Sequence, residues 1–290
     1  MNYSDRNHIQ REIDARRKAL VTDYTKLWHT MVCAWQAPRD DNAVWPMYSA
    51  NYLFNTRGLK WAVDPVLLNN RVPEAPVLDV RQDLKDLDFI LLTHTHIDHT
   101  DPLLWSQLTD TRCHWIVPES MVTFFRQKTA LPASRFSVAV PGKAITIADA
   151  TITPFAAPHF EHLSTGEVNH VHETGYMMTT AREAYLLPGD IRTYESALLP
   201  PFEDVSAVFA HVFLGRSAAL AWNPPLLDAF TDFTLSFHPH KVLLTHLYEF
   251  GREPEDCWRR WHARSVAEAL HTADSSLEVI IPEWYQETQL

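Results

Sequence analysis

The chain contains little cysteine for its length. Its 290 residues include only three cysteines, Cys33, Cys113 and Cys257, which are widely separated and form no Cys-x-x-Cys pair. This number and spacing argue against a disulfide framework and against a zinc site built from thiolates. Three unpaired thiols fit a reducing compartment, and we therefore expect a cytoplasmic protein.

Long apolar segments and basic clusters are also lacking. No segment is long and apolar enough to span a membrane, and the charged start of the sequence lacks the features of a signal peptide. The 25 Lys and Arg residues are outnumbered by 36 Asp and Glu residues, which gives a formal net charge of -11. Without a basic block that could follow a phosphate backbone, we expect a small-molecule substrate and no long nucleic acid as a partner.

Apolar residues make up 46% of the chain, enough for a substantial core, and their spacing predicts a long helix at the start. Between Asp5 and Trp35 they recur at steps of three, four and seven residues, as expected for one face of an amphipathic helix. A Pro- and Asp-rich break follows, from Ala37 to Pro46. We predict a helix with its linker in residues 1–46 and one globular domain in residues 47–290. The helix is expected to pack on that domain, with a dimer contact or a substrate lid as alternatives.

Beyond the break the sequence alternates between strand-like and helix-like segments, without a short internal repeat. This mixture predicts an α+β fold in which helices cover the outer faces of two sheets. Strands are expected at Tyr52–Asn55, Leu59–Val63, Phe89–Leu92, His114–Val117, Ala144–Pro154, Tyr176–Leu187, Val205–Phe213, Lys241–Thr245 and Leu277–Ile281. Helices are expected at Pro102–Leu108, Glu119–Thr129, Pro225–Ser236 and Glu255–His271.

The strongest chemical signal is the segment His94-Thr95-His96-Ile97-Asp98-His99, which follows a buried strand-like run. At a strand end His94 and His96 can point the same way, and Asp98 and His99 follow on the next turn. Imidazoles suit zinc and related divalent metals, and a carboxylate beside them can bind metal and accept a proton. Four polar groups at this position would otherwise need hydrogen-bond partners. The segment therefore predicts a metal site.

This segment resembles the His-x-His-x-Asp-His signature of the metallo-β-lactamase superfamily, and the resemblance extends roughly from Asn51 to Pro282. It implies a four-layer αββα sandwich, here with an N-terminal helical extension. In that family the first two histidines and a distant third bind one metal ion. The aspartate, the adjacent histidine and a last histidine bind the second ion, and another aspartate bridges both. The turn Val63-Asp64-Pro65 and the overall length are most like the branch of ascorbate-6-phosphate lactonase and N-acylphosphatidylethanolamine phospholipase D type hydrolases.

The resemblance also indicates where to seek the three distant ligands. His159 follows the strand-like run that ends near Pro158, Asp190 follows a strand that ends in Gly-Asp, and His246 follows Lys241–Thr245. We therefore predict that His94, His96, Asp98, His99, His159, Asp190 and His246 bind the metals. Alternatives remain for His159 among His162, His170 and His172, and for His246 at His238 and His240.

The expected activity is that of a metal-dependent hydrolase in which a metal-bridging hydroxide attacks a small lactone or other cyclic ester. Two divalent ions are expected, zinc as the first choice and Mn²⁺ or Fe²⁺ as alternatives. Asp98 is predicted to orient the nucleophile and take its proton, and Tyr194 is the candidate acid for the leaving group. Arg192 and Arg216 are candidates for holding an anionic substrate group.

Two other functions remain open at this stage. The same metals would suit a phosphodiesterase acting on a small nucleotide or a lipid head group, whereas a single-iron redox or non-catalytic metal-binding protein belongs to another class. A homo-oligomer formed through the N-terminal helix is a further possibility.

Overall fold

The computed structural model describes residues 5–162 and 168–290, which group into two compact units. The N-terminal unit comprises Arg11–Ala139, with Glu249–Gly251 and Pro282–Leu290. The C-terminal unit comprises Val140–Tyr248 and Arg252–Ile281, together with residues up to Gln10. Each unit contains a seven-stranded sheet, so the expectation of two sheets with helices is confirmed.

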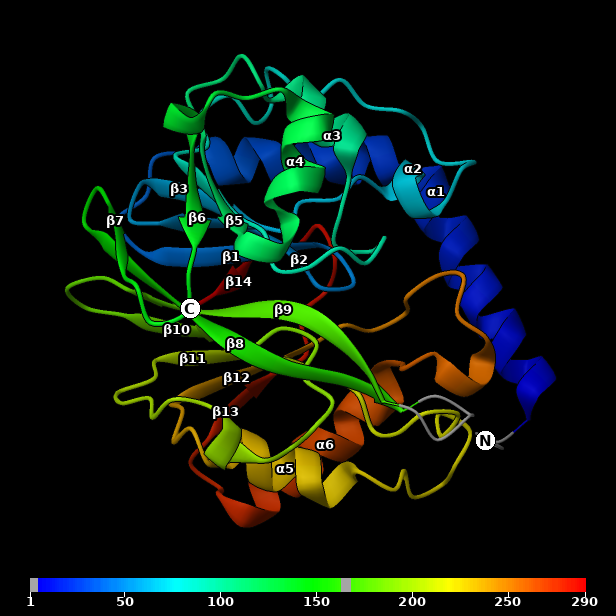
Figure 1. The fold of residues 1–290 in the computed structure, drawn as a ribbon. Helices are drawn as coiled ribbons and strands as arrows, with labels where there is room; N and C mark the ends of the chain where they lie inside the picture. Colours follow the sequence, from blue (N-terminus) through cyan, green and yellow to red (C-terminus); the bar gives the residue numbers. More distant parts are fainter. Residues whose placement is uncertain (1–4, 163–167) are drawn as a thin grey trace. The chain divides into compact units, whose positions relative to one another are not determined.

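The predicted N-terminal helix is present as α1, Arg6–Gln36 (Figure 1). Its apolar stripe, which includes Tyr24 and Met31, is buried. In the N-terminal unit the indole of Trp28 donates to Asp83 at 2.7 Å, and that of Trp35 donates to the Phe54 carbonyl at 2.8 Å. The helix thus packs on its own chain, as expected from its hydrophobic face. The homo-oligomer through this helix stays a prediction.

The sheet of the N-terminal unit has the order β14-β1-β2-β3-β4-β5-β6. Its strands are antiparallel from β14 to β3 and parallel from β3 to β6. Helix α4 packs on β5, and α3 packs on α4 (Figure 1). The strands are Asn42–Tyr48 (β1), Asn51–Thr56 (β2), Leu59–Val63 (β3), Phe89–Leu91 (β4), His114–Pro118 (β5), Phe136–Ala139 (β6) and Thr288–Gln289 (β14), and the helices are Leu68–Arg71 (α2), Pro102–Gln107 (α3) and Val122–Thr129 (α4), with 3-10 turns at Glu119–Met121 and Ala133–Arg135.

The break expected from Ala37 to Pro46 is shorter in the structure, because β1 already begins at Asn42. Pro46 lies inside this strand although proline lacks the amide hydrogen that a strand normally donates. The pairing of β1 with β2 is irregular between Pro46 and Tyr48, and a proline is tolerated at such irregularities. β1 therefore extends across residue 47, where the globular domain was predicted to begin.

The sheet of the C-terminal unit has the order β13-β12-β11-β10-β9-β8-β7. It repeats the pattern of the other sheet, antiparallel from β7 to β10 and parallel from β10 to β13. Helix α6 packs on β12 and β13, and α5 packs on α6 (Figure 1). The strands are Ile145–Ile147 (β7), Ala150–His162 (β8), Val168–Thr179 (β9), Ala184–Leu187 (β10), Ala207–His211 (β11), Lys241–Thr245 (β12) and Glu278–Ile280 (β13), and the helices are Leu227–Leu235 (α5) and Arg260–Ala273 (α6), with 3-10 turns at Ser196–Leu198 and Pro254–Asp256.

Two segments that were each expected as one strand are divided by turns. Ala144–Pro154 contains β7 and the start of β8, and the chain reverses at Ala148, whose φ is 55°. Tyr176–Leu187 contains the end of β9 and the whole of β10. The first turn places a positive φ on an alanine where glycine is usual, so Asp149 is the one residue there that favours a turn.

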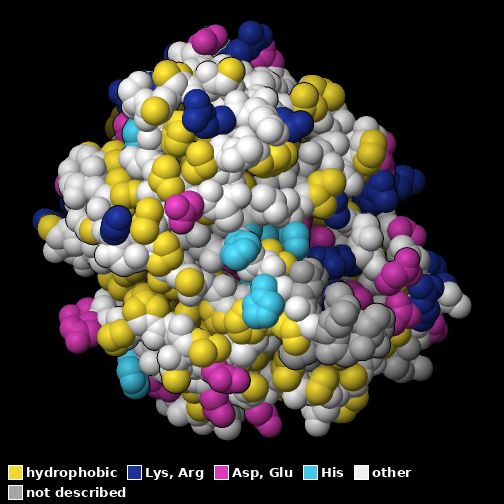
Figure 2. Space-filling model, viewed as in Figure 1, with side chains coloured by type: hydrophobic (Ala, Val, Ile, Leu, Met, Phe, Trp, Pro, Cys, Tyr) yellow, Lys and Arg dark blue, Asp and Glu magenta, His cyan; other side chains and the backbone are white. Residues whose placement is uncertain are grey.

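The surface mixes charges of both signs. On the face shown in Figure 2, Lys and Arg side chains are interspersed with Asp and Glu side chains, as is typical of a solvated protein surface. Among the helices of the described residues, none has the length and apolar character that crossing a membrane requires.

Candidate metal centre

The histidine motif begins just beyond the carboxyl end of β4, at the point where the sequence analysis placed it. The turn from His94 to His99 is fixed to the N-terminal unit by two amides. Asn51 donates to the Asp98 carbonyl at 2.9 Å, and Asn70 donates to the Ile97 carbonyl at 3.0 Å. Because these bonds hold the backbone, the motif's side chains project from a fixed loop.

A buried carboxylate that the sequence analysis did not assign, Asp64, organises this loop. It follows β3, which is parallel to β4, so the two strand ends lie at the same edge of the sheet. Asp64 accepts from the amide and the hydroxyl of Thr93, and its Oδ2 lies 2.8 Å from Nδ1 of His99. Burial raises the pKa of Asp64, while hydrogen bonds from His99 and Thr93 act in the opposite direction.

These bonds select the ring nitrogen that each histidine presents. The Thr93 hydroxyl donates to Asp64, so it can only accept from Nδ1 of His94, which lies 2.9 Å away. His99 likewise directs Nδ1 at the carboxylate. Both rings therefore carry hydrogen on Nδ1 and keep the Nε2 lone pair for a metal ion, as in many carboxylate-histidine-metal arrangements.

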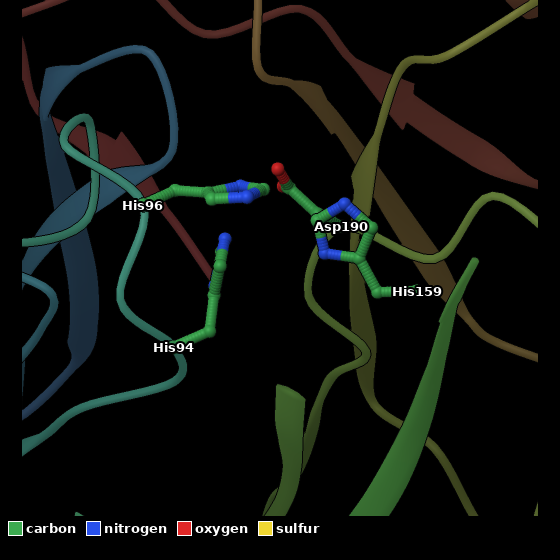
Figure 3. Close-up of side chains that lie close together, drawn as sticks. All are labelled: His94, His96, His159 and Asp190. Carbon is green, nitrogen blue, oxygen red and sulfur yellow. The ribbon is translucent and has the colours of Figure 1, made fainter. Parts of the chain in front are cut away.

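The imidazoles of the motif lie together in the N-terminal unit. The ring centroids of His94 and His96 are 4.6 Å apart, and both side chains are drawn in Figure 3. The His94 and His99 centroids are 4.2 Å apart, and Nε2 of His99 lies 3.6 Å from Oδ2 of Asp98. The four donors of the motif thus form one cluster.

In the C-terminal unit, Asp190 and His246 meet at the carboxyl ends of β10 and β12, which are parallel and are separated in the sheet by β11. Asp190 lies just beyond β10 and His246 directly after β12. Between these strands, β11 ends in His211, whose Nδ1 is 2.7 Å from Oδ1 of Asp190. Nε2 of His246 is 3.3 Å from Oδ2 of the same carboxylate. His211 was missed, although its position at a strand end was a usable signal.

Another predicted ligand of this unit, His159, lies within β8 and not beyond a strand as expected, because β8 continues to His162. It is fully buried, and its Nδ1 lies 2.9 Å from Oε2 of Glu173. Oε1 of Glu173 accepts from the backbone amide of Asp190 at 2.7 Å. Glu173 thus links His159 to Asp190, and the side chains of these two residues are drawn in Figure 3.

The alternative histidines occupy different surroundings. His170 and His172 lie on β9 and are exposed, and the His170 ring packs against Phe160 at 4.6 Å. His238 and His240, before β12, are also exposed. The side chain of His162 lies outside the described part of the structure.

Tyr194 has a packed environment. Its hydroxyl donates to the Phe213 carbonyl, its ring contacts Phe230 and Phe233, and burial raises its pKa. The guanidinium of Arg192 stacks over the Phe213 ring at 4.7 Å. In this structure the Tyr194 hydroxyl donates its proton to the backbone. Catalysis by Tyr194 stays a prediction.

Comparison with known proteins identifies the family. The model of the beta-lactamase superfamily domain matches residues 58–247, which include the histidine motif and the segments of the three distant candidates. The chain belongs to the beta-lactamase superfamily. The α+β metallo-β-lactamase fold expected from the sequence is confirmed, with α1 as the N-terminal helix. A search of curated proteins gives no match.

Solved structures share the superfamily fold at low identity. Igni18, described as a novel metallo hydrolase from Ignicoccus hospitalis KIN4/I, is similar with a TM-score of 0.62 and 15% identity, covering 86% of this chain and 98% of that one. A metal-dependent hydrolase candidate from Veillonella parvula DSM 2008 gives 0.63 and 12%, covering 87% and 100%. CmlA, a diiron β-hydroxylase from Streptomyces venezuelae, gives 0.57 and 15%, covering 87% of this chain and 55% of that one.

The residues at these strand ends fit divalent metal ions. Imidazole and carboxylate donors are the ligands that zinc, manganese and iron accept in proteins. In the N-terminal unit, Nδ1 of His94 faces Thr93 and that of His99 faces Asp64, which directs Nε2 of each ring away from these contacts. Such orientation of histidine by neighbouring groups is usual at metal sites.

Proposed function

We propose that this protein is a metal-dependent hydrolase that opens a small lactone or other cyclic ester, as do lactonases of the branch that its sequence resembles. The observation that supports the proposal most is that buried imidazole and carboxylate groups cluster within each unit, around His94–His99 in one and around Asp190 in the other. Nδ1 of His99 faces Asp64 and Nδ1 of His159 faces Glu173, and a carboxylate that orients the ring in this way is usual for histidines that bind a metal ion.

We assign the ligands in two sets. His94, His96 and His159 would hold one ion, and Asp98, His99 and His246 would hold the second, with Asp190 shared. Within the N-terminal unit the rings of His94, His96 and His99 lie together, and within the C-terminal unit Nε2 of His246 lies 3.3 Å from Oδ2 of Asp190. The first choice for the metal is zinc, because imidazole dominates both sets.

The proposed reaction is the hydrolysis of an ester bond. Bound divalent ions would lower the pKa of a coordinated water and polarise the ester carbonyl. Asp98, whose backbone is fixed by Asn51, would orient the attacking water and receive its proton. A carbon-oxygen bond forms to the water oxygen, the ester bond breaks, and a proton returns to the leaving alkoxide, so the products are a carboxylic acid and an alcohol.

The motif loop also supports an apolar substrate. Ile97, between His96 and Asp98, is 57% exposed, so its aliphatic side chain is accessible beside the proposed ligands. An exposed isoleucine beside the metal ligands would contact the hydrocarbon part of a lactone. A phosphodiester, with its permanent negative charge, would instead favour cationic neighbours.

The experiment compares zinc-loaded protein against matched panels of lactones and phosphodiesters. We expect turnover of lactones, with kcat/KM at least about 100-fold lower in His96→Ala and Asp98→Ala. His240→Ala, at an exposed histidine of the C-terminal unit, is the matched control and should retain activity. If only phosphodiesters are turned over, the lactone assignment is wrong and the substrate is a phosphodiester. If activity is unchanged in Asp98→Ala, the proposed hydrolytic mechanism is wrong.

The same assays test Tyr194 as the leaving-group acid. In that role, Tyr194→Phe should lower kcat most for esters of poorly acidic alcohols, because these need a proton on departure. An equal, small effect on all esters would assign Tyr194 to packing, through its bond to the Phe213 carbonyl.

A further inference from the structure

A buried glutamate outside the predicted ligand set connects two of its members. The Glu173 side chain on β9 is fully buried and has two contacts of different kinds. Oε2 lies 2.9 Å from Nδ1 of His159, and Oε1 accepts from the amide of Asp190 at 2.7 Å. A buried carboxylate is costly unless its oxygens are used, so these contacts need an explanation beyond packing.

We propose that Glu173 is a positioning residue that sets both the ring tautomer of His159 and the backbone position of Asp190 for metal binding. The inference rests on the proposed metal-dependent function. A neutral imidazole carries hydrogen on one nitrogen only. The carboxylate oxygen 2.9 Å from Nδ1 favours the tautomer with its hydrogen on that nitrogen, which would leave the Nε2 lone pair for the metal ion.

The hydrogen bond from the Asp190 amide to Oε1 of Glu173 also fixes the backbone of the proposed bridging aspartate. Because Oε1 holds the amide of Asp190, the backbone that carries this side chain is fixed by the same group that orients His159. Asp64 has the corresponding arrangement in the N-terminal unit, where it accepts from the Thr93 amide and faces Nδ1 of His99. Each unit therefore uses one buried carboxylate to hold a backbone amide and a histidine ring.

The chain leaves room for this carboxylate at Gly189. A Cβ atom at this position would overlap with Oε1 of Glu173, and the residue has a φ of 79°. The glycine that precedes Asp190 thus permits both the turn and the close approach of Glu173.

The decisive variant is Glu173→Gln, which keeps the size of the side chain. Its single carbonyl oxygen can still accept from Asp190, which places the NH₂ group at Nδ1 of His159. His159 must then carry its hydrogen on Nε2 and loses its ligand atom. We expect the affinity of the ion bound by His159 to fall about 10- to 100-fold, while the metal-free variant melts close to the metal-free wild type.

Affinity is measured by chelator competition against Co²⁺, whose visible absorption reports its ligands. Glu268→Gln, an exposed glutamate on α6, is the matched control and should bind as the wild type does. A second readout is the ¹⁵N spectrum of the zinc-loaded protein, in which the hydrogen-bearing Nδ1 resonance of His159 should be present in the wild type and lost in Glu173→Gln.

Failure of this inference can be separated from failure of the proposed function through His159→Ala. If His159→Ala loses one ion and Glu173→Gln keeps wild-type affinity and the Nδ1 resonance, the role of Glu173 is wrong and the ligand set stands. If His159→Ala still binds both ions at wild-type affinity, the proposed ligand set is wrong, and the role of Glu173 falls with it.

Discussion

Gly189 combines a positive φ with a close approach of the Glu173 carboxylate. Replacement by alanine should cost free energy in two ways, because φ is positive and because the new methyl group would displace the Glu173 carboxylate. Gly142 of the same unit offers a matched comparison, with a φ of 77° and nothing within 4 Å of the added atom. We expect Gly142→Ala to lower the free energy of unfolding by about 1–2 kcal/mol and Gly189→Ala by about 1–3 kcal/mol more.

Urea unfolding of the two metal-free variants measures this difference. Because both substitutions carry a similar backbone cost, the excess for Gly189→Ala reports the buried contact of Glu173. Equal losses in the two variants would show that Glu173 moves aside without cost.

At this scale the sequence predicts donors better than it predicts the groups that orient them. The residues of the His94 to His99 motif are neighbours in the chain, so their proximity could be read from spacing alone. Asp64, Glu173 and His211 acquire their roles through strand pairing, which brings distant positions to one sheet edge. Nothing in the local sequence around Glu173 distinguishes it from a surface glutamate.

At the scale of elements, α6 begins with a buried histidine that should make stability depend on pH. Nδ1 of His262 accepts from the amide of Arg259, and Nε2 lies 2.9 Å from the Ala219 carbonyl. Burial, aided by the charge of Arg259, lowers the pKa of His262 from 6.5 to about 3. Below pH 6.5 the unfolded chain therefore binds a proton that the folded protein does not.

Stability from this group is thus fully present above pH 6.5 and is lost as pH falls toward 3. Between pH 7.5 and 5.5 we expect a decrease of roughly 1 kcal/mol in the free energy of unfolding from His262. His262→Gln should be less stable at pH 7.5 but should show a smaller decrease on acidification. His240→Gln, at an exposed position, should keep the wild-type slope. Identical slopes in wild type and His262→Gln would contradict the prediction.

The elements that the sequence predicted well are those with a strong local pattern. The apolar periodicity of α1 and the runs of β4 and β12 gave bounds within a residue or two of the structure. The β7-β8 turn was missed because Ala148 adopts a positive φ that alanine rarely shows. β1 was missed because it contains Pro46, which normally argues against a strand.

At the scale of the whole molecule, family and fold followed from one motif together with the order of later segments. The division into two compact units was not predicted, because it depends on long-range packing. Segment Glu249–Gly251, for example, groups with the N-terminal unit although it lies between two segments of the C-terminal unit. Contacts over such sequence distances leave no local periodicity to read.

Metal ions should stabilise the folded chain as a whole, because the proposed ligands are distributed from His94 to His246 and an unfolded chain cannot gather them. At a free metal concentration of 100 times Kd, each ion adds about 2.7 kcal/mol to the free energy of unfolding. For a chain of this size that corresponds to an increase in Tm of roughly 5–10 °C per ion. Calorimetry of chelator-treated and zinc-reloaded protein measures the shift.

His96→Ala should show a smaller shift in Tm than the wild type. His240→Ala should show the same shift as the wild type, because its exposed ring is not a proposed ligand. A Tm that does not change on chelation would mean that the buried histidines serve packing and not metal binding.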